Sequence, residues 1–428
     1  MPQGKKHLCL QKATQIHLIE AARDAKPVIG LTHNYYRYPA RFSPQFVRAA
    51  IEAFTLPGDT VLDPFVGGGT TLVEAMALNR DAIGIDISSL AAFVSEAKTL
   101  LLKDSEFNVL SRWASRLPDV VNVHHSRPSA SQYEELGYFR NIDTHLYWRL
   151  RKCIEQALAS AIRLHSENAR TIARCAVLRT AQWALDSRKR LPSVPAFRAT
   201  LNTHAKEVIC GARELRTRVE SFGTSPLPMV KCFNASTAGF DETDHGRRLP
   251  MARLVLTSPP YPGVHVLYHR WQVDGRKETP APFWIANKLD GAGASYYTLG
   301  DRKNPGLRTY FENLEKILTS TVALCDSAAT VVQVVAFSEP EWQLEKYLQI
   351  ARNAGLVERF LPLAGSPDGR LWREVPNRRW YADQRGETNG SQEVVLFHHI
   401  SPSVTNRRTN RHNKPRPIAS RTSTTAPI

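Results

Sequence analysis

One short segment of this chain combines hydrogen-bond acceptors with a flat aromatic ring. It reads Thr257-Ser258-Pro259-Pro260-Tyr261 and directly follows the apolar residues 254–256, which are typical of a buried strand. Two prolines stiffen the turn and remove backbone donors, so that carbonyl groups are left as acceptors. An exocyclic amine needs acceptors for its hydrogens and a surface on which its ring can stack. An isolated Ser-Pro-Pro-Tyr is usually a surface turn, but its place after a strand favours a site.

A glycine-rich segment is the second candidate site. It runs from Asp63 to Thr70, between the apolar residues 60–62 and a helical pattern over residues 71–79. Glycines let the backbone turn sharply and approach a ligand, and the start of a helix presents free N–H groups. Asp86 ends the next apolar run, where a carboxylate can hold ribose hydroxyls. These positions predict a nucleotide-like cofactor bound by the following residues: Asp63, Pro64, Phe65, Gly67, Gly69, Thr70 and Asp86.

The elements around both segments predict an α/β protein with a parallel, doubly wound sheet. A strand at 60–62, a helix at 71–79 and a strand at 82–86 form a β-α-β unit. Helical spacing without strand alternation then fills much of residues 104–225, and strand-like runs return after residue 229. We therefore expect four parts: residues 1–103 and 226–400 form the sheet domain, 104–225 form a helical insertion, and 401–428 form a flexible tail.

The charge of the chain indicates a polyanionic partner. The sequence has 56 Lys and Arg against 40 Asp and Glu, a net charge of +16, while its 42% hydrophobic content is that of a folded protein. Neutralising phosphates releases counterions and adds affinity without sequence preference. Residues 401–428 contain six basic residues and no acidic one, and their Ser, Thr and Pro content predicts a disordered basic tail.

The cysteines and the apolar runs restrict the class of protein further. The six cysteines show no CxxC spacing, so we expect reduced thiols in a cytoplasmic protein and no metal site. No run of about 18 apolar residues occurs, which argues against a membrane span.

Together the two segments resemble the amino-methyltransferase family of DNA modification enzymes. DPFVGGGT (63–70) is similar to the family's cofactor loop, and TSPPY (257–261) to its catalytic motif. PARFSPQF (39–46) is similar to the segment that contacts the methionine moiety, which assigns Arg41 and Phe42 to the cofactor. Asn234 takes the place of the polar residue beside the adenine. The resemblance implies S-adenosylmethionine as methyl donor and a Rossmann-like, seven-stranded, mostly parallel sheet of the class I methyltransferase type with one reversed strand.

The resemblance also implies the substrate and the reaction. Such enzymes flip a base out of double-stranded DNA and methylate its exocyclic amine, with the four residues from Ser258 to Tyr261 as the catalytic set and Thr257 beside the cofactor. Serine directly before the two prolines, here Ser258, is commoner in the N4-cytosine enzymes. No cysteine follows a proline in this chain, which argues against methylation of a ring carbon. The insertion lies between the two motifs, where the family places its target-recognition region, and a cognate restriction endonuclease is an expected partner.

Three alternatives stay open from the sequence. Aspartate or asparagine usually precedes the two prolines in N6-adenine enzymes, but serine does not exclude that activity. A methyltransferase acting on guanine N2 of RNA has a similar loop, although it usually carries a separate RNA-binding domain. A non-catalytic DNA-binding protein on the same scaffold is the third alternative, and the intact motif residues argue against it.

Overall fold

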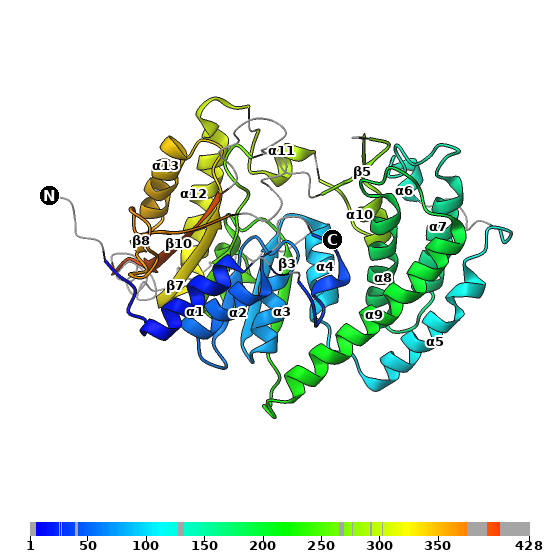
Figure 1. Ribbon diagram of the computed structural model, residues 1–428, viewed down its shortest axis with the longest axis horizontal. Coiled ribbons are helices and arrows are strands. Elements are labelled where there is room, and N and C mark those ends of the chain that lie inside the picture. The colour runs from blue at the N-terminus through cyan, green and yellow to red at the C-terminus, as the bar shows by residue number, and fades with distance from the viewer. Residues whose placement is uncertain are drawn as a thin grey trace, which may run out of the picture.

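A largely parallel β-sheet and a neighbouring bundle of long helices make up the computed structural model (Figure 1). The structure describes residues 6–402 except for 25, 27, 39–41, 127–131, 265–268, 276, 292, 302 and 375–391. Most of the sequence expected to form the basic tail, residues 403–428, therefore lies outside the described residues.

The strands of the main sheet lie in the order β3-β2-β1-β4-β7-β10-β8, and β9 pairs with β10. The five strands β3, β2, β1, β4 and β7 are parallel to one another, whereas β10 is antiparallel to β7, β8 and β9. These strands are β1 (Thr60–Asp63), β2 (Asp81–Asp86), β3 (Val230–Asn234), β4 (Ala252–Thr257), β7 (Cys325–Val335), β8 (Leu356–Arg359), β9 (Leu371–Glu374) and β10 (Gln392–Ile400).

This topology confirms the expected Rossmann-like sheet with one reversed strand. Strands such as β1 and β4 can be recognised in the sequence as continuous apolar runs, because a parallel strand is covered on both faces of the sheet. The eighth strand, β9, was not expected from the sequence. It has only four residues, of which Leu371 alone is buried, so it shows neither an apolar run nor a clear alternation.

Helices cover both faces of the sheet (Figure 1). On one face α1 (Lys12–Arg23), α2 (Pro44–Phe54) and α3 (Thr70–Ala77) share an apolar core with the sheet. On the other face α12 (Arg308–Ala323) and α13 (Pro340–Asn353) do so. Short 3-10 turns lie at His33–Tyr35, Phe240–Glu242, Gly246–Arg248 and Pro305–Leu307.

The helical bundle occupies most of the stretch expected to form an insertion. Its long helices are α5 (Asp104–Val120), α7 (Trp148–Ile162), α8 (Glu167–Leu185) and α9 (Val194–Glu220), with the short α6 (Gln132–Glu135) at one end. They enclose a separate apolar core, to which α4 (Ser89–Thr99) contributes from the side of the sheet. Helix α4 therefore joins the two units.

A segment that follows the TSPPY motif returns to this bundle. The hairpin of β5 (Trp271–Val273) and β6 (Lys277–Thr279) and the helix α10 (Ala281–Ala286) place apolar side chains in the core of the bundle. The sequence had assigned residues 226–400 as a whole to the sheet domain. The periodicity of such short elements does not show which core they enter, so this part of the boundary was missed. The last short helix, α11 (Ala294–Tyr297), follows them.

Trp271 is expected to anchor this returning segment. Its side chain is 2% exposed, and its indole N–H donates to the Tyr36 hydroxyl at 2.9 Å. Trp271→Ala should lower the free energy of unfolding by about 3–5 kcal/mol, the usual cost of truncating a buried large aromatic residue. Trp342→Ala, at a 37% exposed tryptophan, should cost about 1 kcal/mol or less. Denaturant unfolding followed by circular dichroism measures both, and equal losses would contradict the anchoring role.

Candidate functional site

A cavity of about 850 Å³ lies at the carboxyl ends of the central strands. Its walls come from the loops after β1, β2, β3 and β4, from residues 295–301, and from α12. Most of the residues that the sequence assigned to a site line this one cavity: Phe42, Asp63, Pro64, Phe65, Gly67, Thr70, Asp86, Asn234, Ser258, Pro259, Pro260 and Tyr261. Of the other three, Arg41 lies outside the described residues, and Gly69 and Thr257 stand behind the wall.

The glycine-rich loop is held tightly against the next strand and helix. Gly67 and Gly69 have φ angles of 47° and 73°, a region that residues with a Cβ rarely adopt. A Cβ on Gly69 would lie 2.7 Å from the Ser95 hydroxyl oxygen in α4. Gly69 is also the N-cap of α3, so the first N–H groups of that helix start at the loop. Close packing of the loop against α4 therefore excludes a side chain at Gly69.

Asp63 connects three parts of the site. The hydroxyls of Thr71 in α3 and Thr257 in β4 each donate to its carboxylate at 2.7 Å, and the Phe65 N–H donates at 3.2 Å. Asp63 is 2% exposed, and burial raises its pKa to about 6 although these hydrogen bonds act in the opposite direction. Asp63 therefore fixes the glycine-rich loop and the TSPPY loop relative to each other.

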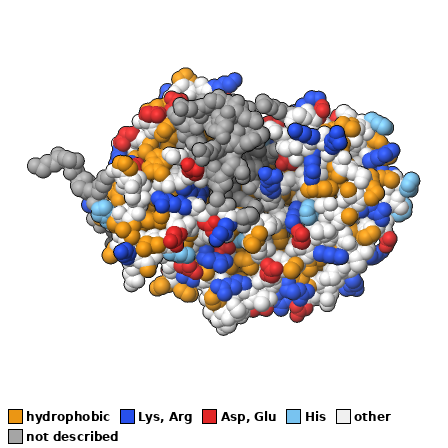
Figure 2. Space-filling model, in the orientation of Figure 1, with side chains coloured by type: hydrophobic (Ala, Val, Ile, Leu, Met, Phe, Trp, Pro, Cys, Tyr) orange, Lys and Arg blue, Asp and Glu red, His pale blue; other side chains and the backbone are white. Residues whose placement is uncertain are grey.

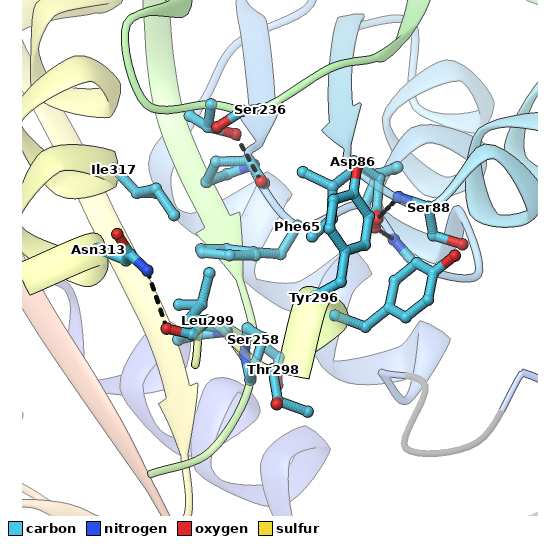
Figure 3. A pocket seen from close by; sticks show the side chains of 18 of the residues that line it. Phe65, Asp86, Ser88, Ser236, Ser258, Tyr296, Thr298, Leu299, Asn313 and Ile317 are labelled. Atoms are coloured by element: carbon cyan, nitrogen blue, oxygen red, sulfur yellow. Dashed lines mark hydrogen bonds between the residues drawn. The ribbon is translucent and has the colours of Figure 1, made fainter. Parts of the chain in front are cut away.

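Asp86 stands at the cavity wall beside the glycine-rich loop (Figure 3). Its two carboxylate oxygens accept the N–H groups of Gly67 at 2.9 Å and Ser88 at 2.8 Å. Burial raises the pKa of Asp86 to about 6, and these two hydrogen bonds lower it less strongly. The Asn234 amide donates to the carbonyls of Asp86 and Ile87, both at 3.0 Å, and so fixes the end of β2.

The TSPPY loop is held by side chains distant in sequence. The Ser258 hydroxyl donates to the Tyr261 hydroxyl at 3.1 Å, and Tyr261 donates to Glu393 of β10 at 2.6 Å. The Tyr310 hydroxyl, from α12, donates to the Pro260 carbonyl at 2.6 Å. Tyr261 lines the cavity but is only 6% exposed, so most of its ring is packed.

The far wall of the cavity, residues 295–301, was not predicted from the sequence. Figure 3 shows Tyr296, Thr298 and Leu299 of this wall facing the same space as Phe65 and Asp86. The Leu299 carbonyl accepts from the Asn313 amide of α12 at 2.9 Å. No motif marks this segment, and only its contacts across the cavity identify it.

Basic side chains are widely distributed on the surface (Figure 2), and the described residues show neither a metal-binding group nor a helix that could span a membrane. Figure 2 shows Lys and Arg side chains spread over both the sheet domain and the helical bundle on one face. Within the described part of the chain, no group of three His, Cys, Asp or Glu side chains is arranged to hold a metal ion. None of the described helices is long and apolar enough to cross a membrane.

The strand order, the single reversed strand and a cavity at the carboxyl ends of the strands define a class I methyltransferase type of fold. Residues 17–95 match a protein-family model described as DNA methylase. This segment runs from within α1 to within α4 and includes the glycine-rich loop and Asp86. The match implies S-adenosylmethionine as the methyl donor.

Curated relatives resemble short parts of the chain. It is 43% identical over 72 residues to the Type II methyltransferase M.BsoBI of Geobacillus stearothermophilus, which covers 17% of this chain and 14% of that protein. It is 39% identical over 66 residues to the Type II methyltransferase M.MjaII of Methanocaldococcus jannaschii, covering 15% and 12%. The chain thus spans about one seventh or less of the length of these two relatives.

A solved structure with broader coverage is the rRNA methyltransferase aviRa from Streptomyces viridochromogenes. It covers 87% of this chain and 90% of its own, with 11% sequence identity and a TM-score of 0.35. Similarity at this level carries no argument about the substrate.

Replacing Asp63 should destabilise the fold, because the three groups that donate to its carboxylate would lose their acceptor. Asp63→Ala should lower the free energy of unfolding by about 2–4 kcal/mol, because each buried polar group left without a partner costs about 1–3 kcal/mol and removing a desolvated carboxylate returns part of this. Asp59→Ala is the matched control, since the Asp59 carboxylate accepts an exposed N–H from Leu56. Denaturant titration of both variants checks this, and an Asp63→Ala variant as stable as the control would contradict it.

Proposed function

We propose that this protein is an S-adenosylmethionine-dependent DNA methyltransferase that methylates the exocyclic N4 of a flipped-out cytosine. The observation that carries the proposal is the single cavity, in which the glycine-rich loop and Asp86 line the same space as Ser258. The match of residues 17–95 to the DNA methylase model supports the DNA substrate. The resemblance to Type II methyltransferases supports a place in DNA modification, and we propose a cognate restriction endonuclease as a partner.

The residues at the glycine-rich end fit the cofactor. Each oxygen of Asp86 accepts one backbone N–H, and a carboxylate has about four acceptor positions, so positions are left for two ribose hydroxyls. Phe42, Phe65 and Gly67 line the same cavity. Bound S-adenosylmethionine supplies a methyl group that is open to nucleophilic attack. In this proposal Asp86 holds the ribose, and Phe42 and the glycine-rich loop surround the methionine moiety.

The residues at the TSPPY end fit an amine. The Ser258 hydroxyl and the backbone carbonyls of the loop are acceptors at the cavity wall. Because Tyr310 already donates to the Pro260 carbonyl, we assign the Pro259 carbonyl as the second acceptor for the amine. Tyr261 contributes the exposed part of its ring as a contact for the base.

These acceptors address the main obstacle to the reaction. The lone pair of an exocyclic amine is conjugated into the ring, which makes the nitrogen a weak nucleophile. Hydrogen bonds from the amine to Ser258 and Pro259 favour a more tetrahedral nitrogen and aim its lone pair. Positioning of the two reactants in one site supplies most of the remaining rate enhancement.

The base must reach a cavity that lies between loops of the protein. A base stacked in a duplex cannot enter it, so we propose that the base is flipped out. The net charge of +16 favours binding to the phosphate backbone. The helical bundle between the two motifs is the proposed target-recognition region. Adenine carries an exocyclic amine as well, and the serine in the motif is the reason for proposing cytosine.

Asp86→Ala should weaken S-adenosylmethionine binding by about 1.5–3 kcal/mol, the usual cost of losing a hydrogen bond to a charged group. Affinity in the wild-type protein should also fall as the pH drops through about 6, because the pKa of Asp86 is raised to about 6 and protonation removes acceptor positions. Calorimetric titrations between pH 5 and 8 measure both effects. In Asp86→Asn the pH dependence should disappear. A dependence that persists in this variant would assign it to Asp63 instead, whose pKa is also raised to about 6.

Methyl transfer into duplex DNA should yield N4-methylcytosine. Tritiated methyl transfer followed by nucleoside digestion identifies the product. Ser258→Ala should lower kcat by about tenfold or more, a loss of about 1–3 kcal/mol, with little change in cofactor affinity. Ser327→Ala, at an exposed serine of β7 that does not line the cavity, is the control and should retain most of the turnover. N6-methyladenine as the sole product would overturn the base, label in RNA alone would overturn the substrate, and no transfer with no cofactor binding would indicate a non-catalytic protein.

A further inference from the structure

A chain of hydrogen bonds leads from the cavity to a buried ion pair. Ser258 donates to the Tyr261 hydroxyl at 3.1 Å, and Tyr261 donates to Oε1 of Glu393 at 2.6 Å. The other carboxylate oxygen, Oε2, accepts from Arg373 Nε at 2.8 Å and lies 2.6 Å from Arg373 Nη2. The side chains of Glu393 and Arg373 are only 5% and 12% exposed. The chain therefore runs from β9 and β10 through Tyr261 to the cavity wall.

The chemistry of the groups fixes the direction of this chain. A carboxylate only accepts hydrogen bonds, so the single hydroxyl proton of Tyr261 is directed to Glu393. In its contact with Ser258, the Tyr261 oxygen must then be the acceptor, because its proton is already used. The proton of Ser258 is therefore directed to Tyr261. Consequently the Ser258 oxygen presents lone pairs and no proton to the cavity.

We propose that Glu393, acting through Tyr261, fixes Ser258 as a hydrogen-bond acceptor and thereby selects a base with an amine at the position facing Ser258. An amine donates to such an oxygen, whereas a carbonyl at the same position meets a second acceptor and is rejected. Glu393 is a positioning residue that touches neither base nor cofactor. The inference rests on the proposed function for the identity of the amine, but the direction of the hydrogen bonds does not depend on it.

The substitution Glu393→Gln should reverse the donor and acceptor roles along this series of hydrogen bonds. Arg373 has only donors, so the amide oxygen of the glutamine must face Arg373, and the amide nitrogen then faces Tyr261. Tyr261 accepts from this nitrogen and turns its own proton to Ser258. Ser258 in turn directs its proton into the cavity and becomes a donor, which favours a carbonyl. Tyr261→Phe removes the connection altogether while it keeps the aromatic ring.

Binding of two free nucleosides, 2′-deoxycytidine and 2′-deoxyuridine, to the full chain measures this selection. The affinity ratio of deoxycytidine to deoxyuridine should fall by about tenfold or more from wild type to Glu393→Gln, the scale of one mismatched buried hydrogen bond. It should also fall in Tyr261→Phe. The nucleosides differ at N3 as well, but that difference is common to all variants, so the change in the ratio reports the group at C4. Titration by nuclear magnetic resonance gives the affinities.

The matched control is Glu358→Gln, which alters another carboxylate paired with an arginine of the same sheet. Glu358 accepts from Arg370 at 2.7 and 3.0 Å and does not line the cavity. This variant should keep the wild-type ratio, which separates a loss of selection from a general loss of stability. A ratio that is the same in wild type, Glu393→Gln and Tyr261→Phe, including the absence of any preference, would overturn the selection.

A neutron crystal structure of the protein tests the direction of the chain without any substrate. Deuterium should lie between Tyr261 and Glu393 and between Ser258 and Tyr261. A Ser258 deuterium directed into the cavity would overturn the inference. Methyl transfer by the wild-type protein tests the proposed function separately, because inactive protein with the expected deuterium positions would reject the reaction and retain the amine-selective site.

Discussion

The rest of the site depends on the hydrogen bonds that the buried carboxylate of Asp63 accepts. Asp63 ends β1, and its carboxylate accepts hydrogen bonds from a hydroxyl near the start of α3 and from the hydroxyl of the last residue of β4. Burial of this charge is costly, as its raised pKa of about 6 shows, and the hydrogen bonds offset part of the cost. In return, two loops that are almost 200 residues apart in the chain are fixed at one edge of the sheet. One side chain therefore holds two of the loops that line the cavity.

The helical bundle is connected to the same cavity through its far wall. The Asp290 N–H donates to the Tyr138 hydroxyl at 2.8 Å, and the Tyr133 hydroxyl donates to Asn287 at 3.0 Å. Asp290 in turn accepts from Tyr297, which lines the cavity. These contacts join residues 132–138 of the bundle to the segment that carries the wall. A displacement of that end of the bundle on binding would therefore be transmitted to the wall facing Asp86 and Ser258.

The parts of the site that could be predicted from the sequence are those formed by consecutive residues. The glycine-rich loop, Asp86 and the TSPPY motif each follow an apolar strand, and local spacing suffices to place them at one edge of a parallel sheet. Glu393, Tyr310 and Asn313 could not be found in this way, because each acts across the fold on a loop distant in sequence. Trp271 was missed for a related reason, since a three-residue strand does not show whether it enters the core of the sheet or of the bundle.

In the proposed reaction, the position of Glu393 would let a carboxylate act on the amine without contacting it. Its charge is paired with Arg373 and separated from the cavity by two hydroxyl groups, so little of that charge acts on the base directly. Glu393 instead sets the orientation of the two hydroxyl protons of Tyr261 and Ser258. Reorienting a hydroxyl proton needs no movement of heavy atoms, but it decides whether Ser258 donates or accepts. If this proposal holds, a serine can stand before the two prolines of the motif, because Glu393 of β10 imposes on it the acceptor character that an aspartate would supply directly.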